Sequence, residues 1–166
     1  MTSSDEILKG RAADASDSDR LVLSILHRRP SRATAIQKLG LLVDSVVRGK
    51  VPEGFAAHHF GGFNDDIDTS LTDLQEEGYV YEKDDGNFAL TPAGETLLGK
   101  YLTDQKAGDV KKVADMIVPR MAHLSDREIL AIAYEAFPAL TEKSLIKASI
   151  EKVRRVKNVE IATIPR

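Results

Sequence analysis

The sequence contains no cysteine, no tryptophan and no long apolar run. Without cysteine, the chain has no disulfide, no thiolate zinc site and no cysteine nucleophile. No apolar stretch approaches the roughly 20 residues that a membrane-spanning helix needs. The first 20 residues also lack the apolar segment of a signal peptide. We therefore expect a cytoplasmic protein with no membrane partner.

The chain also has little net charge. Its 166 residues are 42% hydrophobic and 30% charged, and the formal net charge is −3. This composition is typical of a globular protein that buries a core. Because the net charge is small and negative, the molecule as a whole has no general attraction for nucleic acid or anionic membranes. Local charge must therefore decide the class of partner.

Known catalytic motifs are absent as well. The sequence has no G-x-S-x-G, P-loop, G-x-G-x-x-G or H-E-x-x-H pattern. His58 and His59, close to Asp65 and Asp66, have the chemistry of metal ligands. Adjacent residues of an extended chain point to opposite sides, however, and no third ligand follows at a useful spacing. We expect a non-enzymatic protein with no catalytic residue, no metal and no cofactor.

The N-terminal region predicts one polar segment and then one helix. Residues 1–17 are a polar lead-in with little periodicity and at most one weak helical turn around residues 7–8. Asp17 and Ser18 provide cap signals for the first helix, which Pro30 ends. The apolar stripe of this helix consists of Leu21, Val22, Ile25 and Leu26.

A second helix is expected from an N-cap at Ser31 to about Gly49. Its predicted buried side consists of Ile36, Leu39, Leu42, Val43, Val46 and Val47. Residues 55–63 then form an apolar loop or a short strand.

The third helix is expected to start at the cap Asn64 and to run through Glu77, where Gly78 ends it. Its apolar positions, Ile67, Leu71 and Leu74, fall at i, i+4 and i+7. Residues 79–81 and 88–90 flank a turn at 84–87 and predict a β-hairpin. Thr91 and Pro92 start the next helix.

Three helices, a hairpin and a packed helix are the order of a winged helix-turn-helix domain, here over residues 18–103. Residues 104–166 predict a C-terminal helical extension packed on it. Its expected helices are 105–118, a second from the capping box Ser125–Glu128 to before Pro138, and 141–157. The predicted fold class is α+β, mostly α.

Two short motifs resemble a known family. Residues 60–64, Phe-Gly-Gly-Phe-Asn, are similar to the Phe-Gly-Pro-Tyr-Ser motif of YwgA-like proteins and the related Panacea (SocA-antitoxin-like) group. Residues 90–94, Leu-Thr-Pro-Ala-Gly, resemble their Leu-Thr-x-x-Gly helix start. Residues 134–138 resemble a tail element, so the likeness covers about 30–157. The sequence departs from the family motif at three positions, where Gly62 replaces proline, Phe63 replaces tyrosine and Asn64 replaces serine. Phenylalanine still provides an aromatic ring for packing, and asparagine can still cap the helix. The resemblance implies a regulator or antitoxin-like partner binder.

Charge placement separates the candidate partners. Between residues 65 and 85, nine carboxylates face a single base, Lys83, which gives a local charge of −8. In a winged helix these elements normally approach DNA, where lysine and arginine neutralise phosphates. The outward side of the third helix would repel phosphate. The predicted partner-binding residues are Asp65, Asp68, Thr69, Thr72, Asp73, Glu76 and, on the wing, Tyr81. A solvated face with no partner is the alternative.

Basic residues gather in two other places. Residues 20–50 carry seven bases against one acid, and the predicted last helix, 141–157, has a net charge of +4. One interpretation is that Arg28, Arg29 and Arg32, which cluster at the turn between the first two helices, pair with the acidic third helix. Another is that both groups contact phosphates or an acidic partner. The residues for such contacts are Arg28, Arg29, Arg32, Lys152, Arg154 and Arg155.

Our leading hypothesis is a binding module, regulator-like or antitoxin-like, that engages a protein partner through its acidic helix and wing. The first alternative is a DNA-binding transcriptional regulator that uses the basic residues above. A homodimer formed through the C-terminal helices is also consistent with the sequence.

Overall fold

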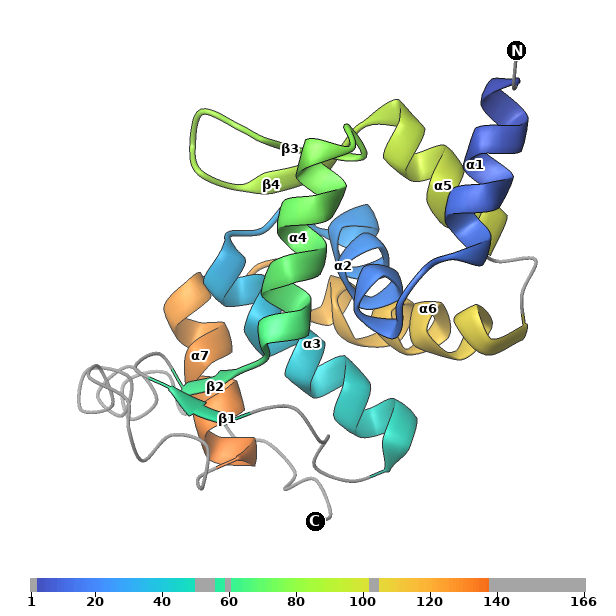
Figure 1. Cartoon of the computed structure of the whole chain (residues 1–166). Helices are drawn as coiled ribbons and strands as arrows, with labels where there is room; N and C mark the ends of the chain where they lie inside the picture. The colour runs from blue at the N-terminus through green and yellow to red at the C-terminus, as the bar shows by residue number, and fades with distance from the viewer. Residues whose placement is uncertain (1–2, 50–55, 59–60, 102–104, 138–166) are drawn as a thin grey trace.

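The computed structural model of the chain describes residues 3–49, 56–58, 61–101 and 105–137 (Figure 1). Over these residues the chain is mostly helical, with two small antiparallel sheets of two strands each. The predicted class, α+β and mostly α, is confirmed. The predicted helix 141–157 and the tail after it lie outside the described residues.

The described elements are short helices and strands. In chain order they are α1 (Ser4–Ala13), α2 (Asp17–Arg28), α3 (Ala33–Arg48), β1 (Ala56–His58), β2 (Gly61–Phe63), α4 (Asp65–Glu76), β3 (Val80–Glu82), β4 (Phe88–Leu90), α5 (Pro92–Tyr101), α6 (Gln105–Ile117), the 3-10 helix η1 (Pro119–Met121) and α7 (Asp126–Ala136). β1 pairs with β2, and β3 pairs with β4 with Val80 opposite Leu90. The predicted loop or single strand at 55–63 thus includes two paired strands.

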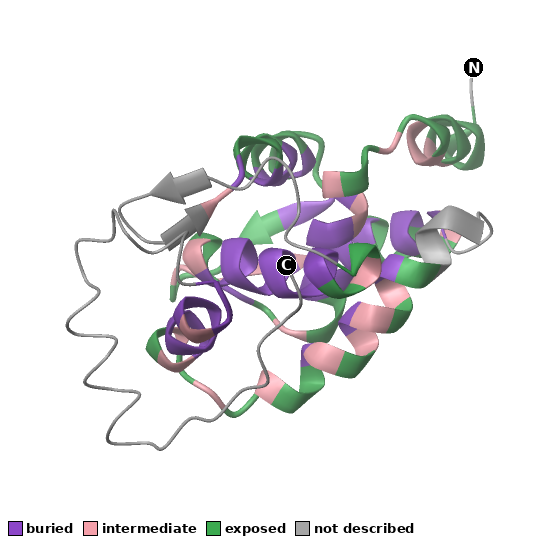
Figure 2. Cartoon of the chain, turned by 90° about the horizontal axis from the view of Figure 1, so that it is seen from below, coloured by how far each residue is buried: buried purple, intermediate pink, exposed green. Residues whose placement is uncertain are grey.

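Helix α2 lies at the centre of the fold and contacts α3, α4, α5 and α6 (Figure 1). Its predicted apolar stripe is buried, as are Ile67, Leu71 and Leu74 on α4. Figure 2 shows buried residues concentrated on the central helices. The prediction that Val46 is buried is wrong: it is 47% exposed, because the last turn of α3 projects beyond the helices packed on it (Figure 1).

The prediction of a polar lead-in with at most one weak helical turn is wrong, because α1 has ten residues. Ser3 and Glu6 form a capping box at its N-terminus. No residue of α1 is buried, but Leu8 and Ala12 pack against the core, and the helix lies beside α5 (Figure 1). Contacts with distant segments stabilise this helix, and periodicity cannot show them.

Two predicted cap positions are shifted. Ser16, not Asp17 or Ser18, caps α2, with Asp19 completing the capping box. Ser31 does not cap α3; it pairs with Phe88 through two backbone hydrogen bonds of 2.8 and 3.1 Å. This bridge adds a third extended segment beside β4. The N-cap of α3 is Arg32, which makes no side-chain cap.

The junction between the hairpin and α5 explains the Leu-Thr-x-x-Gly pattern. The hydroxyl of Thr91 donates to the carbonyl oxygen of Gly78 at 2.7 Å and accepts from the amide of Gly94 at 3.1 Å. A Cβ atom on Gly94 would lie only 2.1 Å from the carbonyl oxygen of Tyr79. Threonine therefore joins the hairpin to the helix, and glycine is required because the backbone of Tyr79 is so close.

Candidate interaction surface

The position of α4 is set at its N-cap by a pair of buried hydrogen bonds. The amide of Asn64 donates to Oε1 of Gln37 at 2.9 Å, and Nε2 of Gln37 donates back to the Asn64 carbonyl at 3.0 Å. The side chain of Asn64 also accepts from the amide of Asp66 at 2.8 Å, as expected for an N-cap. The start of α4 is thus fixed to α3. Sequence analysis identified the cap but missed Gln37.

The end of α4 is equally defined. Gly78 has φ of 84°, the left-handed conformation that favours glycine after a helix. The amide of the next residue, Tyr79, donates to the carbonyl of Leu74 at 2.9 Å. The backbone therefore turns directly from α4 into β3, and the hairpin follows the helix without a loop.

The predicted partner-binding residues all lie on exposed surface. Three carboxylates of the first turn, Asp65, Asp66 and Asp68, complement the positive end of the helix dipole. Asp73 and Glu76 lie nearer the other end, where the dipole does not favour anions. The exposed members are Asp65, Asp68, Thr69, Thr72, Asp73, Glu76 and Tyr81. We call the α4 part of this set the acidic face.

The carboxylates of the acidic face have no counterion among the described residues. Within the described part of the chain, Asp65, Asp68, Asp73 and Glu76 form no ion pair. The neighbouring Glu77, in contrast, forms two hydrogen bonds with the guanidinium of Arg11 on α1, of 2.6 and 3.1 Å. The negative charge of the acidic face is therefore available to an external group.

The hairpin extends this surface with one aromatic ring. Tyr81 on β3 is 47% exposed, whereas Tyr79 is buried in the core. In the turn, the backbone amide of Asn87 donates to Asp85 and lowers the pKa of that carboxyl. The guanidinium of Arg32 donates to the Asp85 carbonyl at 2.9 Å. These contacts order the turn and leave the ring of Tyr81 at the surface.

The arginines between α2 and α3 do not pair with α4, so that interpretation is wrong. Arg28 pairs with Asp115 on α6 at 2.6 Å. Arg29 donates to the carbonyls of Met121 and Leu124 at 3.0 and 2.9 Å. The connection between α2 and α3 lies against α6, η1 and the start of α7, so these are the acceptors within reach.

Asp126 adds a further acceptor for this group. It lies 3.5 Å from Arg29 and 4.0 Å from Arg32. Partial burial opposes the charge of Asp115, but the hydrogen bonds from Arg28 and Lys111 outweigh it and lower the pKa of this carboxyl. The arginines therefore connect the N-terminal and C-terminal helices. Lys152, Arg154 and Arg155 lie outside the described residues.

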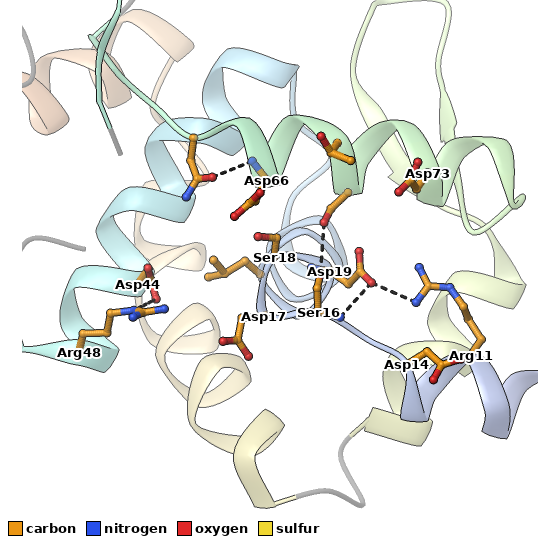
Figure 3. Close-up of a pocket in the computed structure, with 14 residues that line it drawn as sticks. Arg11, Asp14, Ser16, Asp17, Ser18, Asp19, Asp44, Arg48, Asp66 and Asp73 are labelled. Atoms are coloured by element: carbon orange, nitrogen blue, oxygen red, sulfur yellow. Dashed lines mark hydrogen bonds and ion pairs between the residues drawn. The ribbon is translucent and has the colours of Figure 1, made fainter. Parts of the chain in front are cut away.

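A cleft of about 670 Å³ borders the acidic face (Figure 3). It lies between the start of α2, the end of α3 and α4, where Ser16 and Ser70 approach to 3.4 Å. Arg11 and Asp14 lie on one side, and Asp44 and Arg48 on the other (Figure 3). The charged lining residues are Arg11, Asp14, Asp17, Asp19, Asp44, Arg48, Asp66 and Asp73. Sequence analysis missed this cleft because its walls come from four separate elements.

The described residues offer no metal-binding cluster and no membrane-spanning helix. In the described ranges, no three His, Asp or Glu side chains are placed to hold a metal ion. The side chains of His58 and His59 lie outside the described part. No helix in these ranges is both long and apolar enough to cross a membrane.

Comparisons with known proteins give no family for the chain. It matches no protein-family model, and searches of curated proteins and of solved structures also gave no match.

Proposed function

We propose that this chain is a non-enzymatic winged-helix module that binds a protein partner through the acidic face and Tyr81. The observation that carries the proposal is that Asp65, Asp68, Asp73 and Glu76 are exposed on α4 and form no ion pair with the part of the chain that the structure describes. A partner with basic side chains would gain ion pairs there, and complementary charge accelerates association. The proposed module is regulator-like.

The order of elements supports the winged-helix part of the proposal. Helices α2, α3 and α4 precede the β3–β4 hairpin, and Ser31 between α2 and α3 bridges to Phe88 of that hairpin. This arrangement fits a winged helix in which α4 takes the place of the recognition helix and the hairpin that of the wing. The antitoxin-like part of the proposal depends on the sequence resemblance alone.

DNA binding through the basic turn is the weaker alternative. Phosphate contacts require cationic side chains that are free to meet the duplex. Arg29 is mostly buried and Arg28 is paired with Asp115, so forming phosphate contacts would cost the fold these interactions. Arg32 remains 62% exposed. The geometry favours a structural role for Arg28 and Arg29.

A charge-reversal pair tests the proposal. Tagged wild-type chain, Asp73→Lys and Asp109→Lys are each used to purify partners from the native cell, and the bound proteins are quantified. Asp73 lies on the acidic face, whereas Asp109 is an exposed aspartate on α6. We expect the specific partner to be lost with Asp73→Lys and kept with Asp109→Lys. Equal recovery with all three chains would contradict the proposal.

A second measurement addresses DNA directly. Binding of the wild-type chain to mixed-sequence duplex DNA is measured as the salt concentration is varied. We expect no tight binding, because the acidic face repels phosphate. Tight binding with a steep negative salt slope would favour the DNA alternative.

A further inference from the structure

Arg11 joins α1 to two carboxylates of other elements. Its Nε and Nη2 donate to Glu77 at 2.6 and 3.1 Å, and its Nη1 donates to Asp19 at 3.0 Å. The guanidinium is thus bound by both oxygens of Glu77, the two-point geometry that arginine forms best with carboxylates. Glu77 immediately follows α4, so a guanidinium is already bound next to the C-terminal end of the acidic face.

The other attachments of α1 are weak. None of its residues is buried, and apart from the pairs of Arg11, its ion pair with the body, between Asp5 and Lys100 at 2.5 Å, lies on half-exposed surface. Exposed ion pairs contribute little to stability and are screened by salt. Since only Leu8 and Ala12 add apolar contacts, Arg11 is the main specific link between α1 and the rest of the molecule.

The position of Arg11 also connects it with the cleft. Arg11 lines the cleft together with Asp66, Thr69 and Asp73 of α4 (Figure 3). The cleft is therefore continuous with the acidic face. An arginine from a partner lying along α4 would meet Glu77 at the end of that helix, the exposed carboxylate that Arg11 now holds.

We propose that α1 is a displaceable clasp, in which Arg11 occupies the position that an arginine of the partner takes on binding. The inference rests on the proposed function, since it assumes that the acidic face receives a basic protein segment. It specifies the chemistry of that segment as guanidinium. It also implies that binding detaches α1 from Glu77, whose carboxylate then pairs with the guanidinium of the partner.

The test uses a fluorescent nona-arginine peptide as the probe and the full chain as the receptor. Affinity is compared for wild type, Arg11→Gln and Lys9→Gln. Lys9 is an exposed base on the same helix that pairs only with Asp5 among the described residues, so it controls for the loss of one positive charge. We expect Arg11→Gln to bind the peptide about threefold or more tightly, because the internal competitor is gone. Lys9→Gln should stay within about twofold of wild type.

Hydrogen exchange of wild-type chain keeps the test independent of any variant's folding. Adding the peptide should accelerate exchange of the backbone amides of residues 7–13. Unchanged exchange in α1, or equal affinity of Arg11→Gln and Lys9→Gln, would overturn the clasp. If Asp73→Lys still weakens peptide binding in that case, the acidic face stands and only the clasp fails. If Asp73→Lys has no effect either, both proposals fail.

Discussion

Lys38 is the most deeply buried charged side chain in the described part of the chain. It lies on α3 and is 1% exposed. Burial disfavours the charged ammonium and lowers the pKa of Lys38 to about 8, from an ordinary value of 10.5. In the unfolded chain the same lysine stays protonated up to its ordinary value. The two states therefore hold different numbers of protons between these two pH values.

This difference predicts that the folded chain becomes more stable as pH rises from about 8 toward 10.5. In this window the unfolded state binds the extra proton, so the free energy of unfolding increases with pH, by up to about 3 kcal/mol. Urea unfolding of wild type and Lys38→Met at several pH values checks the prediction. The methionine variant should lack the increase. Parallel curves for both proteins would assign the pH dependence to another group.

The elements depend on a few positions where backbones meet closely. Gly94 in α5 is one, because the carbonyl oxygen of Tyr79 occupies the place that a side chain would need. For Gly99, on the same helix, no atom of another described element lies within 4 Å of an added Cβ. The two glycines thus differ in packing but share their helix.

Alanine substitution at these two positions should have opposite effects. Gly94→Ala should lower the free energy of unfolding by about 2 kcal/mol or more, because the backbone of the hairpin must move. Gly99→Ala should raise it by about 0.5–1 kcal/mol, since alanine favours a helix more than glycine does. Thermal or urea unfolding of both variants measures this. A harmless Gly94→Ala would show that the junction is loose.

Sequence analysis predicted the elements whose signals are local. Asn64 and Gly78 delimit α4, Thr91 and Pro92 start α5, and Ser125 with Glu128 caps α7. It failed where contacts with residues far away in the sequence determine the local structure. Ser31 looks like a helix cap, but its backbone pairs with Phe88, 57 residues later, and α1 depends on contacts with Glu77 and Lys100.

One part of the candidate site can also be predicted from the sequence, and another part cannot. The exposure of the acidic face follows from the helical period of α4, because the buried positions Ile67, Leu71 and Leu74 fix the opposite side. The cleft and the Arg11 contacts do not follow from any period. They exist because α1, α2, α3 and α4 meet, which is a property of the tertiary fold.

Across the whole molecule, Arg29 joins the first helices to the last described ones. Its guanidinium contacts two backbone carbonyls and Asp126, from a side chain that is only 15% exposed. The planar guanidinium serves several acceptors at once, which an ammonium group cannot do with the same geometry. The role of Arg29 therefore depends on its shape as well as its charge.

Arg29→Lys should lower the free energy of unfolding by about 1–2 kcal/mol although the charge is kept. Arg120→Lys, at an exposed arginine of η1, is the matched control and should have little effect. Chemical unfolding of the two variants gives the comparison. Equal stability of both would mean that Arg29 acts only through its charge, as a phosphate-binding residue would.

The exposed carboxylates of α4 also bear on how copies of the chain can associate. In a two-fold symmetric dimer the same patch of each subunit meets its own equivalent. A dimer centred on α4 would bring together two surfaces that each carry a charge of −8 over residues 65–85. Their mutual repulsion disfavours that geometry, most strongly in dilute salt. A homodimer formed through another surface would avoid this repulsion and would leave α4 open while the chain is paired.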